Sequence, residues 1–299
     1  MNPGLNTADT VVGPELRPVA ETLGSAQIGL AGSTSGVTLV LMAISDLVLR
    51  EGDGLRASGR VVTEGETVWF EPPLAVPLLW RHPDKVPVRR HSEFGVPVLG
   101  VDLANLDDRR ATSGVVEGWA TLTGTWQRDH LLVERQESRG GRSESSATRW
   151  RRPPCPPPPG GWPEGGTNEN IHVPSDVLAT ITITSLAMFR PSSRHTVLVV
   201  AAEEPEHAET VLRPICGDRL CVVRSRWTKQ QLDNASQRLR AEMRAWLIYG
   251  TGQSASEDGQ GVLTVKLTRV LPSFAQWADT MPDGLLAVTP WLAPRRTSQ

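Results

Sequence analysis

The densest group of polar side chains in the sequence lies between Trp80 and Phe94. It contains three arginines and two histidines, in the order Arg81, His82, Arg89, Arg90 and His91. Arginine can bind a carboxylate or phosphate through two parallel hydrogen bonds, so the segment predicts a loop that binds an anionic or peptide ligand. The alternative is a solvated loop held by its two aromatic ends, because most charged loops bind nothing.

A second group of basic residues precedes a strongly patterned helix. Its members are Arg224, Arg226 and Lys229, with Trp227 between them. Positive charge at a helix N-terminus suits a phosphate or another anion, so these three residues form a candidate anion-binding site. The competing interpretation is that Trp227 packs against the helix and the charges are solvated.

No motif for catalysis accompanies these groups. The sequence lacks GxSxG, Ser-x-x-Lys, HExxH, a CxxC pair and a phosphate-binding glycine loop. His82 and His91 are nine residues apart without flanking cysteines or paired carboxylates, which disfavours a metal site. We therefore expect no metal, no cofactor and no catalytic residues, and the sequence favours a protein that is not an enzyme.

The three cysteines carry information about the compartment. None belongs to a CxxC pair, and Cys155 lies in a proline-rich stretch that reads as exposed. Cys221 lies in an apolar run, where a small buried thiol is expected. Free cysteines suit a reducing environment, and no signal peptide is visible, so the sequence predicts a cytoplasmic protein.

Charge and hydropathy limit the classes of partner. Residues 1–150 contain 15 Lys and Arg against 19 Asp and Glu, and residues 151–299 contain 16 against 14. Neither half has the basic excess that phosphate backbones require, so nucleic acid is an unfavoured partner. The apolar run at 37–49 is too short for a membrane span and contains Asp46. The expected partner is a protein or a small molecule.

Composition divides the chain into four segments. Residues 1–35 show no sustained period and are expected to form an irregular arm, and residues 36–138 have the pattern of strands. Six of the seven residues from 153 to 159 are proline, which predicts a stiff, solvated spacer within a Pro/Gly-rich linker at 139–170. The fourth segment, 171–294, mixes strands and helices. The predicted class is α+β.

The 36–138 segment predicts a small β-barrel. Strands are expected at 55–62, 67–70, 96–101, 115–126 and 131–133, with one or two helical turns capped by Asp102 after the third. Three strands, a short helix and two strands is the order of elements in an OB-like barrel. A six-stranded barrel that also uses 37–49 is the alternative.

The 171–294 segment predicts an α+β sandwich. Strands are expected at 178–184, 196–202, 219–223, 261–271 and 285–288, with helices at 203–213, from Thr228 to Leu247 and at 272–279. The pattern of strand, helix, turn and strand occurs at 196–227 and again at 261–291. A ferredoxin-like fold or a duplicated βαβ unit, with four strands in one sheet, would explain it.

Three stretches of the second half carry a resemblance. Residues 217–228, 265–271 and 290–294 resemble uncharacterised two-domain proteins of high-GC actinobacteria. The resemblance implies a bacterial cytosolic setting and supplies no activity, ligand or site residues.

Three hypotheses about function follow from these patterns. The leading one is a non-catalytic binding or interaction protein. The alternatives are an enzyme, for instance a hydrolase, with its site in the interdomain cleft, and an adaptor that binds nucleic acid through the barrel.

Overall fold

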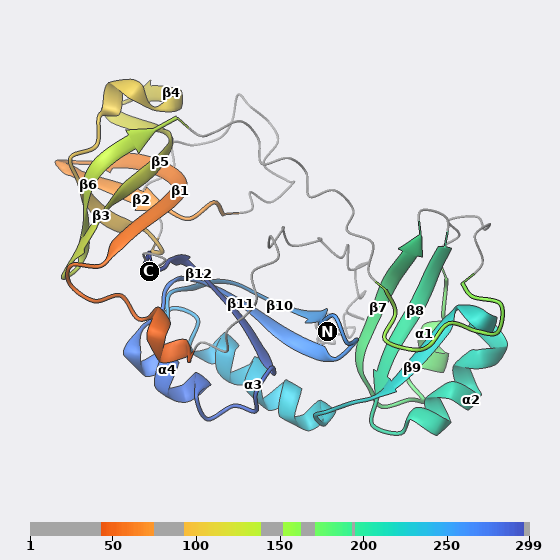
Figure 1. Cartoon of the computed structure of the whole chain (residues 1–299). Helices are drawn as coiled ribbons and strands as arrows, with labels where there is room; N and C mark the ends of the chain where they lie inside the picture. The colour runs from red at the N-terminus through yellow and green to blue at the C-terminus, as the bar shows by residue number, and fades with distance from the viewer. Residues whose placement is uncertain (1–42, 75–92, 139–151, 163–170, 193–194, 296–299) are drawn as a thin grey trace, which may run out of the picture. The chain divides into compact units, whose positions relative to one another are not determined.

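The computed structural model describes residues 43–74, 93–138, 152–162, 171–192 and 195–295 (Figure 1). It is a mixed α+β structure composed mostly of sheet. A six-stranded sheet is formed by the first half of the chain, and two three-stranded sheets with helices are formed by the second half.

The six-stranded sheet confirms the expected strands and adds one. Its strands run in the order β1-β2-β3-β6-β5-β4, and β1 also pairs with β5 along nine residues. Five strands therefore form a closed ring of pairings, in the order β1-β2-β3-β6-β5-β1. All are antiparallel except β3 with β6, which is parallel. The strands are β1 (Gly54–Glu64), β2 (Thr67–Glu71), β3 (Val96–Leu99), β4 (Asp107–Thr112), β5 (Val115–Gln127) and β6 (His130–Glu137).

Alternation along the strands gives this sheet its core. In β1 the buried Leu55, Ala57 and Val61 alternate with polar residues, as one buried face requires. A short 3-10 helix at Leu103–Asn105 follows β3, and the side chain of Asp102 accepts the Ala104 N–H, as the sequence predicted. Residues 44–47 also form a 3-10 helix, so the alternative strand at 37–49 is wrong there.

The second half contains two units with the same order of elements. In the first, β7 (Ile183–Ser192) pairs antiparallel with β8 (His195–Ala202), α2 (Pro205–Cys216) follows, and β9 (Leu220–Arg224) returns parallel to β8. In the second, β10 (Ile248–Ala255), β11 (Gly261–Arg269), α4 (Pro272–Ala278) and β12 (Leu286–Leu292) repeat this pairing. The expectation of four strands in one sheet is wrong, because each unit keeps its own three-stranded sheet.

The helix between the units, α3 (Lys229–Ala241), has the predicted start. Thr228 and Gln231 form the capping box, and the buried Leu232, Ala235 and Leu239 form its apolar stripe. The helix is shorter than predicted: it ends at Ala241, residues 242–247 form a turn, and Leu247, the last of them, has a left-handed φ of 54° just before β10. The predicted strand at 178–184 is displaced as well: α1 (Ser175–Leu178) stands at its start, and β7 begins at Ile183.

The end of β12 contacts the six-stranded sheet. Leu292 is fully buried in the apolar core of that sheet, and the Trp291 indole N–H donates to the Ser58 carbonyl at 2.9 Å. The Arg295 N–H donates to the carbonyl of Gly54 at 2.6 Å. The final strand of the second unit therefore contributes to the core of a sheet that begins more than 200 residues earlier.

Candidate functional site

A hollow of about 370 Å³ lies beside β9 in the first unit. We call it the strap hollow, because residues 152–162, the proline strap, form one of its walls. Strand β9 forms the floor, and α2 with the turn after it forms the opposite wall. The lining residues are Cys155, Pro156, Pro158, Pro159 and Trp162 from the strap, Glu209, Arg213 and Asp218 from the opposite wall, and Leu220, Cys221 and Val222 from β9.

The proline strap packs against the sheet at three residues, Pro153, Cys155 and Trp162, so the expectation of a solvated spacer is wrong for these, while most other residues of 152–162 are exposed. Pro153 is buried, and Cys155 and Trp162 pack against an apolar cluster that includes Val197 and Val199. Cys155 forms a disulfide with Cys221, and their Cα atoms are 5.7 Å apart. Because two cysteines are oxidised, the prediction of free thiols is wrong for both, and the cytoplasmic location loses that support.

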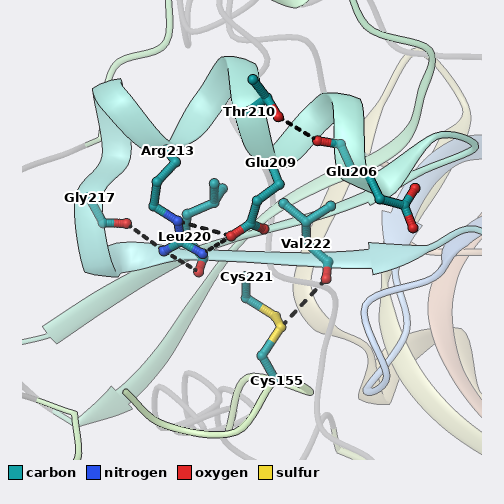
Figure 2. A network of polar contacts seen from close by, with 9 residues as sticks. All are labelled: Cys155, Glu206, Glu209, Thr210, Arg213, Gly217, Leu220, Cys221 and Val222. Atoms are coloured by element: carbon teal, nitrogen blue, oxygen red, sulfur yellow. Dashed lines mark hydrogen bonds and ion pairs between the residues drawn. A yellow bond between two sulfur atoms is a disulfide. The ribbon is translucent and has the colours of Figure 1, made fainter. Parts of the chain in front are cut away.

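Arg213 organises the α2 wall. Its Nε donates to Glu209 Oε1 at 3.0 Å, and its Nη2 forms a very short ion pair with the same oxygen. Its Nη1 donates to the Gly217 carbonyl at 2.8 Å and to the Leu220 carbonyl at 3.5 Å. Figure 2 shows this network on one side of β9 and the disulfide on the other. Arg213 thus joins the end of α2 to the start of β9.

The charges on this wall leave an acidic excess. Two carboxylates, Glu209 and Asp218, face one guanidinium, that of Arg213. The ion pair uses one oxygen of Glu209, and the Asp218 side chain is exposed. A cationic group in the hollow would therefore find a complementary charge.

Strand β9 is an edge strand among the described residues, since its sheet runs in the order β7-β8-β9. Its carbonyl oxygens alternate in direction, as those of every strand do. Three alternate ones contact groups outside β8: Leu220 O accepts from Arg213, Val222 O lies 3.8 Å from Cys155 Sγ, and Arg224 O accepts from Gln260 Nε2 at 3.1 Å. A disulfide sulfur carries no hydrogen, so the Val222 contact is no hydrogen bond. The backbone groups of Leu220 and Val222 therefore face the hollow.

Two titratable groups near the hollow are perturbed by burial. Burial lowers the pKa of His195, and the positive charge of Arg219 lowers it further. The His195 ring lies 5.8 Å from the ring of Trp162, and within the described residues its Nε2 has no hydrogen-bond partner. Burial raises the pKa of the Cys216 thiol, which keeps it protonated and poorly nucleophilic.

The predicted anion-binding residues each contact an acidic side chain. Arg224 pairs with Glu206 at 3.1 Å, Arg226 forms a very short ion pair with Asp258, and Lys229 pairs with Asp233 at 2.8 Å. The backbone N–H of Lys229, at the start of α3, donates to Glu203 Oε1 at 2.7 Å. A carboxylate of the chain itself thus lies where an external anion was expected. Trp227 is buried and donates to the Gly261 carbonyl at 2.5 Å, in line with the packing interpretation.

The other predicted site lies outside the described residues. Arg81, His82, Arg89, Arg90 and His91 all belong to it. After them, Phe94 contacts the ring of Tyr249, with centroids 6.4 Å apart, and its carbonyl accepts from Thr268 at 2.9 Å. Glu93 lies 3.4 Å from Arg244. The loop's C-terminal end therefore contacts the second unit, and its role in binding stays a prediction.

The sequence reasoning missed the strap hollow. The sequence did contain one signal of the hollow: Cys155 lies within a run of prolines, with Trp162 shortly after it. A disulfide at that cysteine would hold the prolines against the surface of the protein. Residue spacing does not identify the partner cysteine, which lies 66 positions away.

In the described parts of the chain, no three His, Cys, Asp or Glu residues gather closely enough to hold a metal ion. No helix there is long and apolar enough to cross a membrane. No known protein family, curated protein or solved structure matches this chain.

Proposed function

We propose that the protein is a non-catalytic binding protein and that its ligand occupies the strap hollow. The observation that carries the proposal is the arrangement of the hollow's walls. Proline, tryptophan and a disulfide form a wall that loses little conformational freedom when a ligand is bound, because the strap is already fixed at Cys155. The volume lies within the range of ligand pockets.

The polar groups of the hollow favour binding over catalysis. Arg213 donates its hydrogen bonds to Glu209 and to the Gly217 carbonyl within the protein. The pKa of the free thiol of Cys216 is raised. A general base or nucleophile needs a tuned pKa and a free path to substrate. Recognition through shape, backbone groups and charge suits this lining better.

We also propose that the closed ring of strands in the first half is an OB-like barrel. The support is the order β1-β2-β3-β6-β5-β1, its single parallel pair β3–β6, and the 3-10 helix between β3 and β5. In this interpretation β4 is an addition at the edge of β5. The fold assigns no ligand by itself, so the proposed function rests on the hollow.

The test is an NMR titration of 15N-labelled protein with nucleotides, organic acids and short peptides. With at least one compound class, we expect the amide signals of 220–222 and the indole signal of Trp162 to shift, and the compound to remain chemically unchanged. Shifts confined to other regions with every compound, or conversion of a compound, would overturn the proposal.

A further inference from the structure

We propose that the ligand of the strap hollow is an extended peptide with a basic side chain, and that it adds a strand to the edge of β9. The inference rests on the proposed function, because it names the ligand class of the same site. Edge strands bind extended peptides through main-chain hydrogen bonds, and flanking pockets select the side chains.

The first argument is the direction of the backbone groups. Leu220, Val222 and Arg224 direct their carbonyls away from β8. In a strand the N–H of a residue points to the same side as its carbonyl, so the Val222 N–H also faces the hollow. Arg213 reaches Leu220 O only at 3.5 Å, at the limit for a hydrogen bond. Part of the strand edge is therefore available for a peptide.

The second argument is the shape of the two walls. The side chains of Leu220 and Val222 pack toward α2, while Cys221 and Val223 pack toward the strap. Both layers therefore flank the edge of β9, as Figure 2 shows for α2 and the disulfide. An edge flanked by two walls favours a single extended chain over a second copy, because the edge of a second copy carries its own strap and α2.

The third argument is charge. Among the residues that line the hollow, the two carboxylates of Glu209 and Asp218 outnumber the one guanidinium, that of Arg213. A peptide strand beside β9 directs alternate side chains to this wall. A lysine or arginine at that position would be attracted, and a glutamate would be repelled.

The probe for the test is the peptide acetyl-Thr-Val-Arg-Val-Thr-amide, titrated into the full chain under non-reducing conditions by calorimetry and NMR. Matched peptides carry N-methyl groups on alternate amides, in either register, or glutamate in place of arginine. We expect the parent peptide to bind and to shift the signals of 220–222. One of the two methylated registers should bind at least about tenfold more weakly, since it loses main-chain hydrogen bonds but no side chain.

Two variants of β9 supply the protein control. Val222→Pro removes the outward N–H, and proline is tolerated in an edge strand when its missing N–H faces away from the neighbour. Val222→Ala keeps that N–H. We expect Val222→Pro to weaken the parent peptide about tenfold or more relative to Val222→Ala. The methylated peptides decide the question if Val222→Pro does not fold.

The outcomes separate this inference from the proposed function. Equal binding of the parent and both methylated peptides would overturn strand addition, as would the absence of binding by the parent. A nucleotide or organic acid that shifts the hollow's signals in place of the peptide would also overturn the inference, but it would leave the proposed function standing. If no compound shifts the signals of the hollow, both strand addition and the proposed binding function are wrong.

Discussion

The two repeated units of the second half use the same pairings but differ at their third strand. In the first unit β9 ends at Arg224, whose side chain is 64% exposed and pairs with Glu206. In the second unit β12 ends at Leu292, which is fully buried in the core of the six-stranded sheet. The corresponding position thus holds a solvated charge in one unit and a core residue in the other.

The two units thus use the end of the same third strand differently. The second unit uses the end of its third strand for packing within the chain. The first unit leaves the edge of its third strand beside a hollow and fixes a proline strap next to it. A unit whose third strand does not end in the core of another sheet is the better candidate for binding, since an available strand edge is a template for another chain.

The largest expected effect separates the two strand ends. Leu292→Ala should lower the free energy of unfolding by about 2–5 kcal/mol, the usual cost of truncating a buried leucine. Arg224→Ala should cost less than about 1 kcal/mol, because exposed ion pairs contribute little. Urea unfolding of both variants measures the difference. Similar costs at the two positions would remove the contrast between the units.

The second expected effect is the contribution of the proline strap to stability. The strap contacts the first unit, where Cys155 is bonded to Cys221 of β9. Reduction of Cys155–Cys221 by dithiothreitol should lower the unfolding free energy by roughly 2–4 kcal/mol, since the bridge restricts the unfolded chain. The variant Cys155→Ser should show no response to the reductant. A matched control, Cys216→Ser, should keep the full response, because Cys216 forms no disulfide. An unchanged midpoint for the reduced wild type would mean that the strap adds nothing to the fold.

The smallest expected effect is a pH dependence from His195 in β8. Burial lowers the pKa of His195 in the folded protein below the ordinary value of 6.5. At a pH between the lowered value and 6.5, the unfolded chain therefore binds a proton that the folded protein does not bind. The folded state should therefore lose stability as pH falls from above 6.5 toward the lowered folded value. Urea unfolding between pH 8 and 5 should show a smaller loss for His195→Gln. If the unfolding free energies of the wild type and His195→Gln depend on pH in the same way, His195 is not the source of the pH dependence.

Local patterns predicted much of the fold. Strands β1 and β5 alternate buried and polar residues, and α3 has a capping box and an apolar stripe, so each was visible in the sequence. Strand β4 was missed, because its residues are all polar or alanine and no residue in it is buried. Strand β10 was missed for a similar reason: glycine and polar residues dominate it, and its pairing with β11 determines its conformation.

The site was harder to predict than the strands. The proline run was correctly identified as neither helix nor central strand, but its packing depends on a disulfide across 66 residues. The position of β9 at the edge of its sheet depends on the strand order β7-β8-β9, which sequence periodicity does not reveal. Of the predicted anion-binding residues, Arg224 and Arg226 had suitable charges, but their acidic partners, Glu206 and Asp258, are distant in sequence.

The burial of Leu292 also bears on how the chain is made by the ribosome. Synthesis proceeds from the N-terminus at about 5–20 residues per second, and domains generally fold as they emerge. The six-stranded sheet has left the ribosome's active site by residue 137, but one of its core side chains is added about 150 residues later. For roughly 8–30 seconds the nascent sheet therefore lacks this contact, and the complete core can form only late in translation.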